Sequence, residues 1–343
     1  MGTPFKNLLF SSPKIFSPIS PSTNFVINST KKSNIAKQLF NNDAGAIKKK
    51  VQSNVKIHVT DYDLTKLKVP TPTDILFNTP NKNELLTNGV KEKQEFNILG
   101  KGAFGTVIRG INKGSIVAIK IVKNKNNNHI NEKNALHLHH ENIVKTIDIT
   151  FSSTLNYFLV LMEYFPKCIS LQQLLDSEDD ITESQKLKFA LDVTKGLQYC
   201  HENNVLHLDV KPKNMLIHDN CCKLCDFGNS VLKDDLRNFN HQGTIAYTDP
   251  EILLGKLPST KSDIYSLGIV LWQIKYRKLP YENTDNNETI IYKVVKIGMR
   301  PKGYEENCEY WKLFCQCWDC DPEQRPQIGD ILNELNSLLV THK

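Results

Sequence analysis

The sequence has 343 residues, 40% of them hydrophobic and 23% charged, which is enough apolar material for a large folded domain. The sequence has a net charge of +6, and the positive excess is concentrated near its start, since residues 1–90 contain twelve Lys and only five acidic residues. This basic excess is too dilute for a nucleic-acid-binding face, and no apolar run is long enough to span a bilayer, so we expect neither nucleic acid nor a membrane as a partner.

Residues 1–92 are rich in Ser, Thr, Asn, Lys and Pro and show little sustained periodicity. Such a composition buries too little apolar surface to offset the entropy of the chain, so we predict a disordered basic tail. Six Ser/Thr-Pro pairs lie in it, at Thr3, Ser12, Ser17, Ser20, Thr71 and Thr79. They either stiffen a linker or are sites for proline-directed kinases, whose phosphates would each add about −1.5 to −2 charge.

From about residue 93 the pattern of apolar residues becomes regular. It predicts strands on both sides of a glycine-rich turn at 98–108, and further strands at 116–122, 143–149 and 157–163. A short helix is expected at 131–139. A capping box at Thr182 and Gln185 begins a helix that runs to about His201, and later helical patterns cover 261–276, 287–297, 308–318 and 327–340.

These elements indicate an α+β fold in two lobes, within a domain at residues 93–340. The first lobe, residues 93–163, would hold five strands and one main helix. The second, residues 169–340, would be mostly helical, and a hinge at residues 163–168 would join the two. Clefts between lobes are favoured ligand sites, so we expect the functional residues to converge there.

Nine cysteines without a secretory signal favour reduced thiols in a cytoplasmic protein. Cys315, Cys317 and Cys320 lack a second pair at metal-finger spacing and lie in an amphipathic helical pattern. Buried thiols are therefore favoured there over a metal site.

A short stretch of the second lobe, residues 209–228, contains candidate catalytic residues. Asp209 is followed by Lys211 and Asn214, and Asp226-Phe-Gly comes twelve residues after Asn214. One carboxylate, Asp209, would accept a hydroxyl proton, Asn214 and Asp226 would hold Mg²⁺, and Lys211 would neutralise the moving phosphoryl group. The spacing predicts transfer of a phosphoryl group from a metal-bound nucleotide to a hydroxyl.

The glycine-rich run at residues 100–107 predicts a backbone hairpin over the phosphates. A dinucleotide-binding turn has the same glycines, but here a strand rather than a helix follows, and Lys120 comes next in Val-Ala-Ile-Lys. Glu132, on the following helix, is the candidate ion-pair partner of Lys120. Together with the Asp209 run, these motifs resemble those of the eukaryotic protein kinases.

The resemblance implies roles for further residues. Met162 would be the gatekeeper of the adenine pocket, and Leu136 would face the core and stack towards Phe227 and His207. Nucleotide contacts are expected from Gly100, Lys101, Gly102, Ala103, Phe104, Gly105, Val107, Ala118, Lys120, Met162, Glu163, Phe165 and Leu216.

Several second-lobe residues match the serine/threonine kinases. Lys211 together with Thr244 is their pattern, since tyrosine kinases carry other residues at both places. Asp263 is expected to hold the backbone of the catalytic loop, and Glu251 to form a buried pair with Arg325. Asp249, which stands where Ala is usual before Pro-Glu, puts the fine geometry of substrate docking in question.

Three stretches are similar to the Mos kinases: His-Leu-Asp at 207–209, the segment 132–144 that begins at Glu132, and Cys-Lys-Leu-Cys before Asp226. This resemblance implies a monomer that phosphorylates a MAP kinase kinase in oocyte meiotic maturation and arrest. The Wee/Myt kinases, some of which share the catalytic loop, are the alternative, and a pseudokinase scaffold is a third. Leu208 stands where most regulated kinases carry an arginine that pairs with a phosphate, so we expect an activation segment ordered by packing.

Residues 48–50, three lysines, are followed by Val55 and Ile57, an arrangement that resembles a MAP-kinase docking site. The alternative is a linker with an incidental lysine run. A docking site of this kind would bind an acidic patch, so its affinity would fall with salt.

Overall fold

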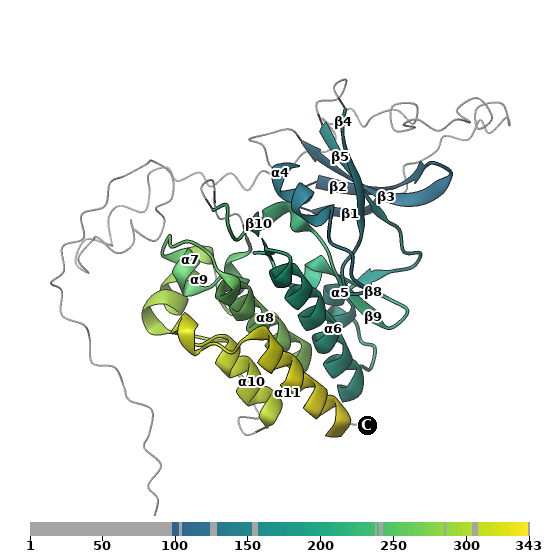
Figure 1. Ribbon diagram of the computed structural model, residues 1–343. Helices are drawn as coiled ribbons and strands as arrows, with labels where there is room; N and C mark the ends of the chain where they lie inside the picture. The colour runs from purple at the N-terminus through teal and green to yellow at the C-terminus, as the bar shows by residue number, and fades with distance from the viewer. Residues whose placement is uncertain are drawn as a thin grey trace, which may run out of the picture. The chain divides into compact units, whose positions relative to one another are not determined.

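The computed structural model describes residues 98–102, 105–123, 129–152, 157–236, 239, 243–284, 286–303 and 308–341. The predicted tail at residues 1–92, with its Ser/Thr-Pro pairs and docking-like lysines, lies outside these residues, as do Ala103 and Phe104. In Figure 1 strands β1–β5 lie together with the short helix α4, and helices α5–α11 form a second group below them.

The first lobe is one antiparallel sheet with the strand order β1-β2-β3-β5-β4. Its strands are β1 (Ile98–Gly102), β2 (Gly105–Asn112), β3 (Ser115–Lys123), β4 (Thr146–Ser152) and β5 (Tyr157–Glu163). Lys120 lies opposite Val107 on one side and Val160 on the other, near the centre of the sheet. Residues that lie opposite each other share a face of the sheet, which fixes the direction of the Lys120 side chain.

Strand β4 begins at Thr146, later than the predicted start at residue 143. Residues 142–144 pair instead with the second lobe: Val144 N donates to Leu224 O at 2.8 Å, and Leu224 N donates to Asn142 O at 2.8 Å. This pairing connects the two lobes directly through their backbones.

Helix α4 (His129–Glu132) is followed by a single 3₁₀ turn, Lys133–Ala135, so the predicted helix at 131–139 is shorter than expected. The prediction that Leu136 faces the core is wrong, because its side chain is 36% exposed. A 3₁₀ turn has three residues per turn instead of 3.6. Ala135, three residues after Glu132, is the residue of this turn that enters the core.

The second lobe is mostly helical, as predicted. Its helices are α5 (Leu171–Asp176), α6 (Glu183–Glu202), α7 (Pro250–Leu253), α8 (Thr260–Tyr276), α9 (Asn287–Tyr292), α10 (Glu309–Cys317) and α11 (Ile328–Thr341). The predicted capping box starts α6, where Thr182 accepts from Gln185 N and Gln185 accepts from Thr182 N. The 287–297 pattern divides into α9 and a π turn, Lys293–Ile297, which ends at Gly298.

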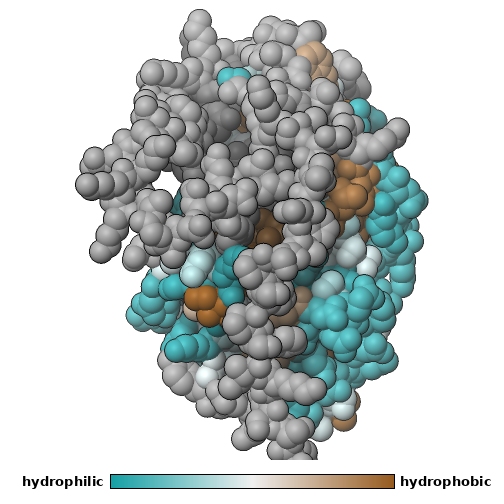
Figure 2. Space-filling view, turned by 90° about the vertical axis from the view of Figure 1, so that its left-hand side faces the viewer, coloured by the Kyte–Doolittle hydropathy of each residue, from teal (hydrophilic) through white to brown (hydrophobic). Residues whose placement is uncertain are grey.

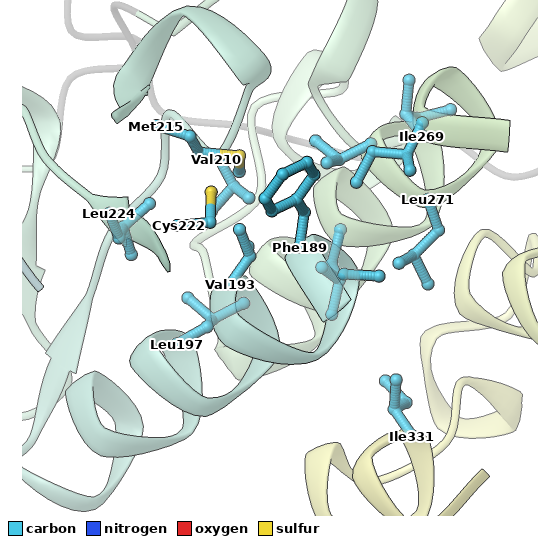
Figure 3. Packing of buried hydrophobic residues seen from close by; sticks show 14 of the residues in the cluster. Phe189, Val193, Leu197, Val210, Met215, Cys222, Leu224, Ile269, Leu271 and Ile331 are labelled. Atoms are coloured by element: carbon cyan, nitrogen blue, oxygen red, sulfur yellow. The ribbon is translucent and has the colours of Figure 1, made fainter. Parts of the chain in front are cut away.

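A large hydrophobic core lies under the catalytic loop (Figure 3). Phe189, Val193 and Leu197 of α6 face Met215 of β8 (Met215–His218) and Leu224 of β9 (Cys221–Leu224). Burial of each such side chain stabilises the fold by roughly 1.5–3 kcal/mol. Because Asn214 directly precedes β8 and Asp226 closely follows β9, this packing fixes the positions of both residues.

On the face shown in Figure 2, hydrophilic side chains cover most of the described surface, with separate hydrophobic patches between them. None of the described helices is both long and apolar enough to cross a bilayer. The sheet and the helical part together confirm the predicted α+β, two-lobed fold.

Candidate active site

Lys120, Glu132 and Asp226 meet where the two lobes face each other. The Lys120 ammonium forms ion pairs with Glu132 Oε1 and, at 2.6 Å, with Asp226 Oδ1. Burial alone would lower the pKa of Lys120, but the two carboxylates outweigh it and raise this pKa above its usual value. The lysine is therefore a fixed positive charge. Sheet, helix α4 and the segment after β9 each supply one member of the triad.

Asp226 has a left-handed backbone, with φ +66° and ψ 75°, and its carboxylate accepts a hydrogen bond from Gly228 N at 3.4 Å. Burial opposes ionisation of Asp226, but attraction by Lys120 prevails and lowers its pKa below the usual value. A Cβ on Gly228 would lie 3.2 Å from Asp226 Oδ1, 3.3 Å from Glu132 Oε1 and 3.5 Å from Lys120 Nζ. Glycine at this position leaves room for the triad.

The catalytic loop surrounds the carboxylate of Asp209. Lys211 Nζ donates to Asp209 Oδ2 at 2.7 Å and to Thr244 Oγ1 at 2.7 Å. Asn214 Nδ2 donates to the same carboxylate at 2.8 Å, and Thr244 Oγ1 donates to its Oδ1 at 3.1 Å. Asp209, Lys211 and Asn214, which spacing predicted to act together, are thus in direct contact. Lys211 also contacts Thr244, the other residue of the serine/threonine-kinase pattern.

Asp263 of α8 holds the backbone that carries Asp209. Its carboxylate accepts from His207 N at 2.9 Å and from Leu208 N at 2.8 Å, and it contacts His201 Nε2 at 2.9 Å. Leu208 has φ +60°, an unfavourable conformation for a branched side chain, and these bonds compensate for the strain. The expected role of Asp263 agrees with this geometry, and His201 is an additional partner.

The residues expected to contact the adenine come from strands of both lobes. Ala118 of β3 lies opposite Met162 of β5, and Leu216 lies on β8 below. Glu163 N donates to Lys145 O at 3.0 Å, so the group of Glu163 that remains for an adenine edge is its carbonyl. Phe165 packs against the ring of His218 with centroids 5.1 Å apart.

The glycine-rich hairpin lies at the β1–β2 turn, where Gly102 is opposite Gly105. Gly105 has φ +152°, and a Cβ there would lie 2.2 Å from Ile121 O, so only glycine fits. At Gly100 a Cβ would meet no atom within 4 Å among the residues that the structure describes, so a ligand could approach the backbone closely there. The side chain of Lys101 lies outside the described part of the structure.

Asn214 and Asp226 have the oxygen atoms needed to bind the Mg²⁺ of MgATP. Asn214 bonds to Asp209 through its nitrogen, which leaves the amide oxygen for a metal, and Asp226 supplies a carboxylate. Within the described ranges, no group of three or more His, Cys, Asp or Glu side chains could hold a metal. Two oxygen ligands suit Mg²⁺, which usually takes the rest of its octahedron from phosphates and water.

Comparison with known proteins decides the family. Residues 93–335 match the protein kinase domain family. The chain is 33% identical over 255 residues to a serine/threonine-protein kinase mos of Patiria pectinifera, covering 68% of this chain and 72% of that one. It is 32% identical to the proto-oncogene serine/threonine-protein kinase mos of Rattus norvegicus, covering 66% and 76%, and 31% identical to that of Sus scrofa, covering 70% and 79%.

The chain belongs to the Mos family of serine/threonine-protein kinases. The kinase domain implies that this Mos-type enzyme uses ATP and a divalent metal and acts on a protein substrate. The resemblance drawn from residues 207–209, 132–144 and 222–228 is therefore confirmed.

In this Mos-type kinase the catalytic loop has Leu208 in place of the usual arginine. Its side chain packs against the activation segment, which runs from Asp226 to Glu251. Leu208 is buried, at 7% exposure, in a small apolar cluster. The other members of this cluster are Leu206, Ile252, Val231, Leu236 and Phe239. Apolar contacts thus occupy the place where an arginine would pair with a phosphate.

The end of the activation segment is anchored by Arg325. Its Nη2 donates to Glu251 Oε2 at 2.8 Å, and its Nη1 lies 3.7 Å from Asp249 Oδ2. Asp249 is also the N-cap of α7, where it accepts from Ile252 N at 3.1 Å. Burial, together with a hydrogen bond that protonated Asp249 donates to the Glu251 carboxylate, raises the pKa of Asp249 to about 7. Two carboxylates thus share one guanidinium.

This anchor should make stability depend on pH. Asp249 binds a proton more tightly in the folded than in the unfolded state, so its contribution favours folding at low pH and is lost as pH rises towards 7. Asp249→Asn keeps the N-cap acceptor without the charge, so it should stabilise the protein more at pH 8 than at pH 5. Thermal unfolding of both proteins at the two pH values tests this. An equal shift in Tm at both would contradict it.

Sequence reasoning missed four contributors to this site. Asn131, Asn134 and Ser230 bond across the lobes, and His201 supports Asp263. No motif spacing marks them, because each acts through a contact with a distant segment. The capping role of Asp249 could have been found, since Asp followed by Pro is a typical start of a helix.

Proposed function

We propose that the protein transfers the γ-phosphoryl group of MgATP to serine or threonine residues of a MAP kinase kinase, in oocyte meiotic maturation and arrest. It would act in the cytoplasm as a monomer, through a kinase domain at residues 93–340 preceded by a basic tail that docks a MAP kinase. The contact of Lys211 with both Asp209 and Thr244 is the observation that carries the serine/threonine specificity. The family relationship supports the choice of substrate.

The proposed mechanism assigns a task to each charged group. Asp209 accepts the proton of the substrate hydroxyl as its oxygen attacks, and Lys211 balances the charge that develops. Thr244 orients the Asp209 carboxylate through its hydroxyl, 3.1 Å away. Lys120, held by Glu132, would contact the α- and β-phosphates.

The metal ligands in this proposal are Asn214 and Asp226, with Mg²⁺ as the ion. When bound, MgATP supplies the phosphoryl group and the cation that neutralises it. Cys225 N donates to Asn214 O at 2.9 Å, which ties the backbones of the two ligands together. Val107, Ala118, Met162 and Leu216 would exclude water around the adenine.

A direct transfer assay tests the substrate. The full-length protein is incubated with MgATP and a catalytically inactive MAP kinase kinase, and the phosphosites are mapped by mass spectrometry. We expect phosphate on serine or threonine of the MAP kinase kinase at a rate well above that on a generic protein such as myelin basic protein. Transfer to the generic protein alone would refute this substrate and leave the kinase assignment in place.

Activity should not require a phosphate on the activation segment. The Leu208 side chain has no hydrogen-bond donor for a phosphate, and the activation segment packs against this side chain instead. We expect full-length protein co-expressed with a phosphatase to retain turnover within a few-fold of phosphorylated protein. Mass spectrometry confirms that Ser230, Thr244 and Thr248 are bare. A loss of tenfold or more, about 1.4 kcal/mol of barrier, would refute phosphate independence.

A further inference from the structure

Four hydrogen bonds join helix α4 and the turn after it to the segment that follows Asp226. Asn131 Nδ2 donates to Gly228 O at 3.1 Å, and Ser230 Oγ donates to Asn131 O at 2.9 Å. Asn134 Nδ2 donates to Ser230 O and to Ser230 Oγ, both at 3.1 Å. We call Asn131, Asn134 and Ser230, with the Gly228 carbonyl, the α4 clamp.

We propose that Asn131 and Asn134 are positioning residues that hold Glu132 against Lys120 and so keep the kinase in its active arrangement. The proposal rests on the roles assigned above to Lys120 and Glu132. It adds the element that places Glu132, for which neither motif spacing nor family membership supplies a residue.

Helix α4 needs such support. It has four residues and continues only as one 3₁₀ turn, and helices this short are unstable unless other parts of the protein hold them. The clamp residues flank Glu132, one position before it and two after it. Their partners, Gly228 and Ser230, follow Asp226 closely, so the clamp fixes Glu132 relative to the other carboxylate that contacts Lys120.

The hydrogen bonds of the α4 clamp are partly buried, so breaking one of them should be costly. Ser230 is fully buried, with 0% exposure, and its hydroxyl both donates and accepts within the clamp. Removing one partner from such a buried network leaves the other partner unpaired, which costs more than the bond itself contributes. The bonds are neutral, so they operate without a phosphate. They can therefore order this region in a kinase whose Leu208 cannot pair with one.

The test uses near-isosteric changes in the full-length protein. Asn134→Leu removes both donors of Asn134, and Ser230→Ala removes the shared hydroxyl. Lys133→Ala is the matched control, because Lys133 lies on the same turn with an exposed side chain. Turnover is measured with myelin basic protein, so the result does not depend on the proposed substrate. The melting temperature of each variant is recorded in parallel.

We expect Asn134→Leu to lower kcat about tenfold or more, Ser230→Ala to lower it several-fold, and Lys133→Ala to stay within twofold. The double variant Asn134→Leu/Ser230→Ala should lose less than the product of the single effects, because the two residues share a bond. In a Glu132→Gln background Asn134→Leu should cause no further loss, since the clamp acts through Glu132. A purely structural role would predict multiplied losses in that background.

Wild-type turnover in both Asn134→Leu and Ser230→Ala would overturn the proposal, as would multiplied losses with Glu132→Gln. If Asn134→Leu does not fold, the comparison of Ser230→Ala with Lys133→Ala in both backgrounds decides. Failure of the proposed function looks different: the wild-type protein itself would not phosphorylate the MAP kinase kinase, whatever the variants do.

Discussion

Asp226→Asn is expected to lower turnover by about 10²–10³-fold while the protein keeps its melting temperature within a few degrees. The change removes the carboxylate expected to bind Mg²⁺, and loss of one preorganised electrostatic contact has an effect of this size. The fold should persist because Lys120 keeps its ion pair with Glu132. Steady-state kinetics and thermal unfolding measure the two quantities. Asp219→Asn is the control, since the Asp219 side chain is 89% exposed in the β8–β9 turn.

Lys120→Met provides a contrast within the same triad. It should cause a similar loss of turnover but also destabilise the protein, because Glu132 would stay buried without its partner and close to Asp226. Turnover within tenfold of wild type in either variant would contradict the assigned roles. Equal melting temperatures for Lys120→Met and Asp226→Asn would contradict the structural argument.

Asp209→Asn is expected to lower the rate of phosphoryl transfer by about 10²–10⁴-fold, the usual range for loss of a general base that also positions its substrate. In the structure Asp209 accepts from Lys211, Asn214 and Thr244, three donors that an amide cannot satisfy equally. The catalytic loop should nevertheless stay in place, since Asp263 holds its backbone.

Single-turnover experiments separate this effect from nucleotide binding. Because the role proposed for Asp209 concerns the substrate hydroxyl and not the nucleotide, the Kd for ATP should change less than threefold in Asp209→Asn. A tenfold weaker Kd with an unchanged transfer rate would assign Asp209 to nucleotide binding instead.

The parts of the site that sequence could predict are those in which chemistry fixes both residue type and spacing. Lys120 contacts Glu132 and Glu251 contacts Arg325, each as the motifs predicted. Lys211 also contacts Thr244, a residue that the motifs marked only as part of the serine/threonine-kinase pattern. Local signals also sufficed for the start of α6, where the capping box depends only on neighbouring residues. These features need no knowledge of distant packing.

Distant packing explains the errors. Strand β4 starts late because Ile143 pairs with Leu224, which is 81 positions further along the chain. Leu136 is exposed because the helix before it tightens into a 3₁₀ turn. The α4 clamp went unnoticed because Asn134 and Ser230 are common residue types that meet across 96 positions. Periodicity and motif spacing carry no information about such contacts.

The measurement that tests the central claim most directly is transfer of labelled phosphate from MgATP to protein by purified wild-type enzyme and by Asp226→Asn, followed by analysis of the phosphorylated amino acids. The proposed site predicts label on serine and threonine with the wild-type protein and at least 100-fold less with the variant, in line with the effect of one preorganised charge. Label on tyrosine, or equal incorporation by the two proteins, would contradict it.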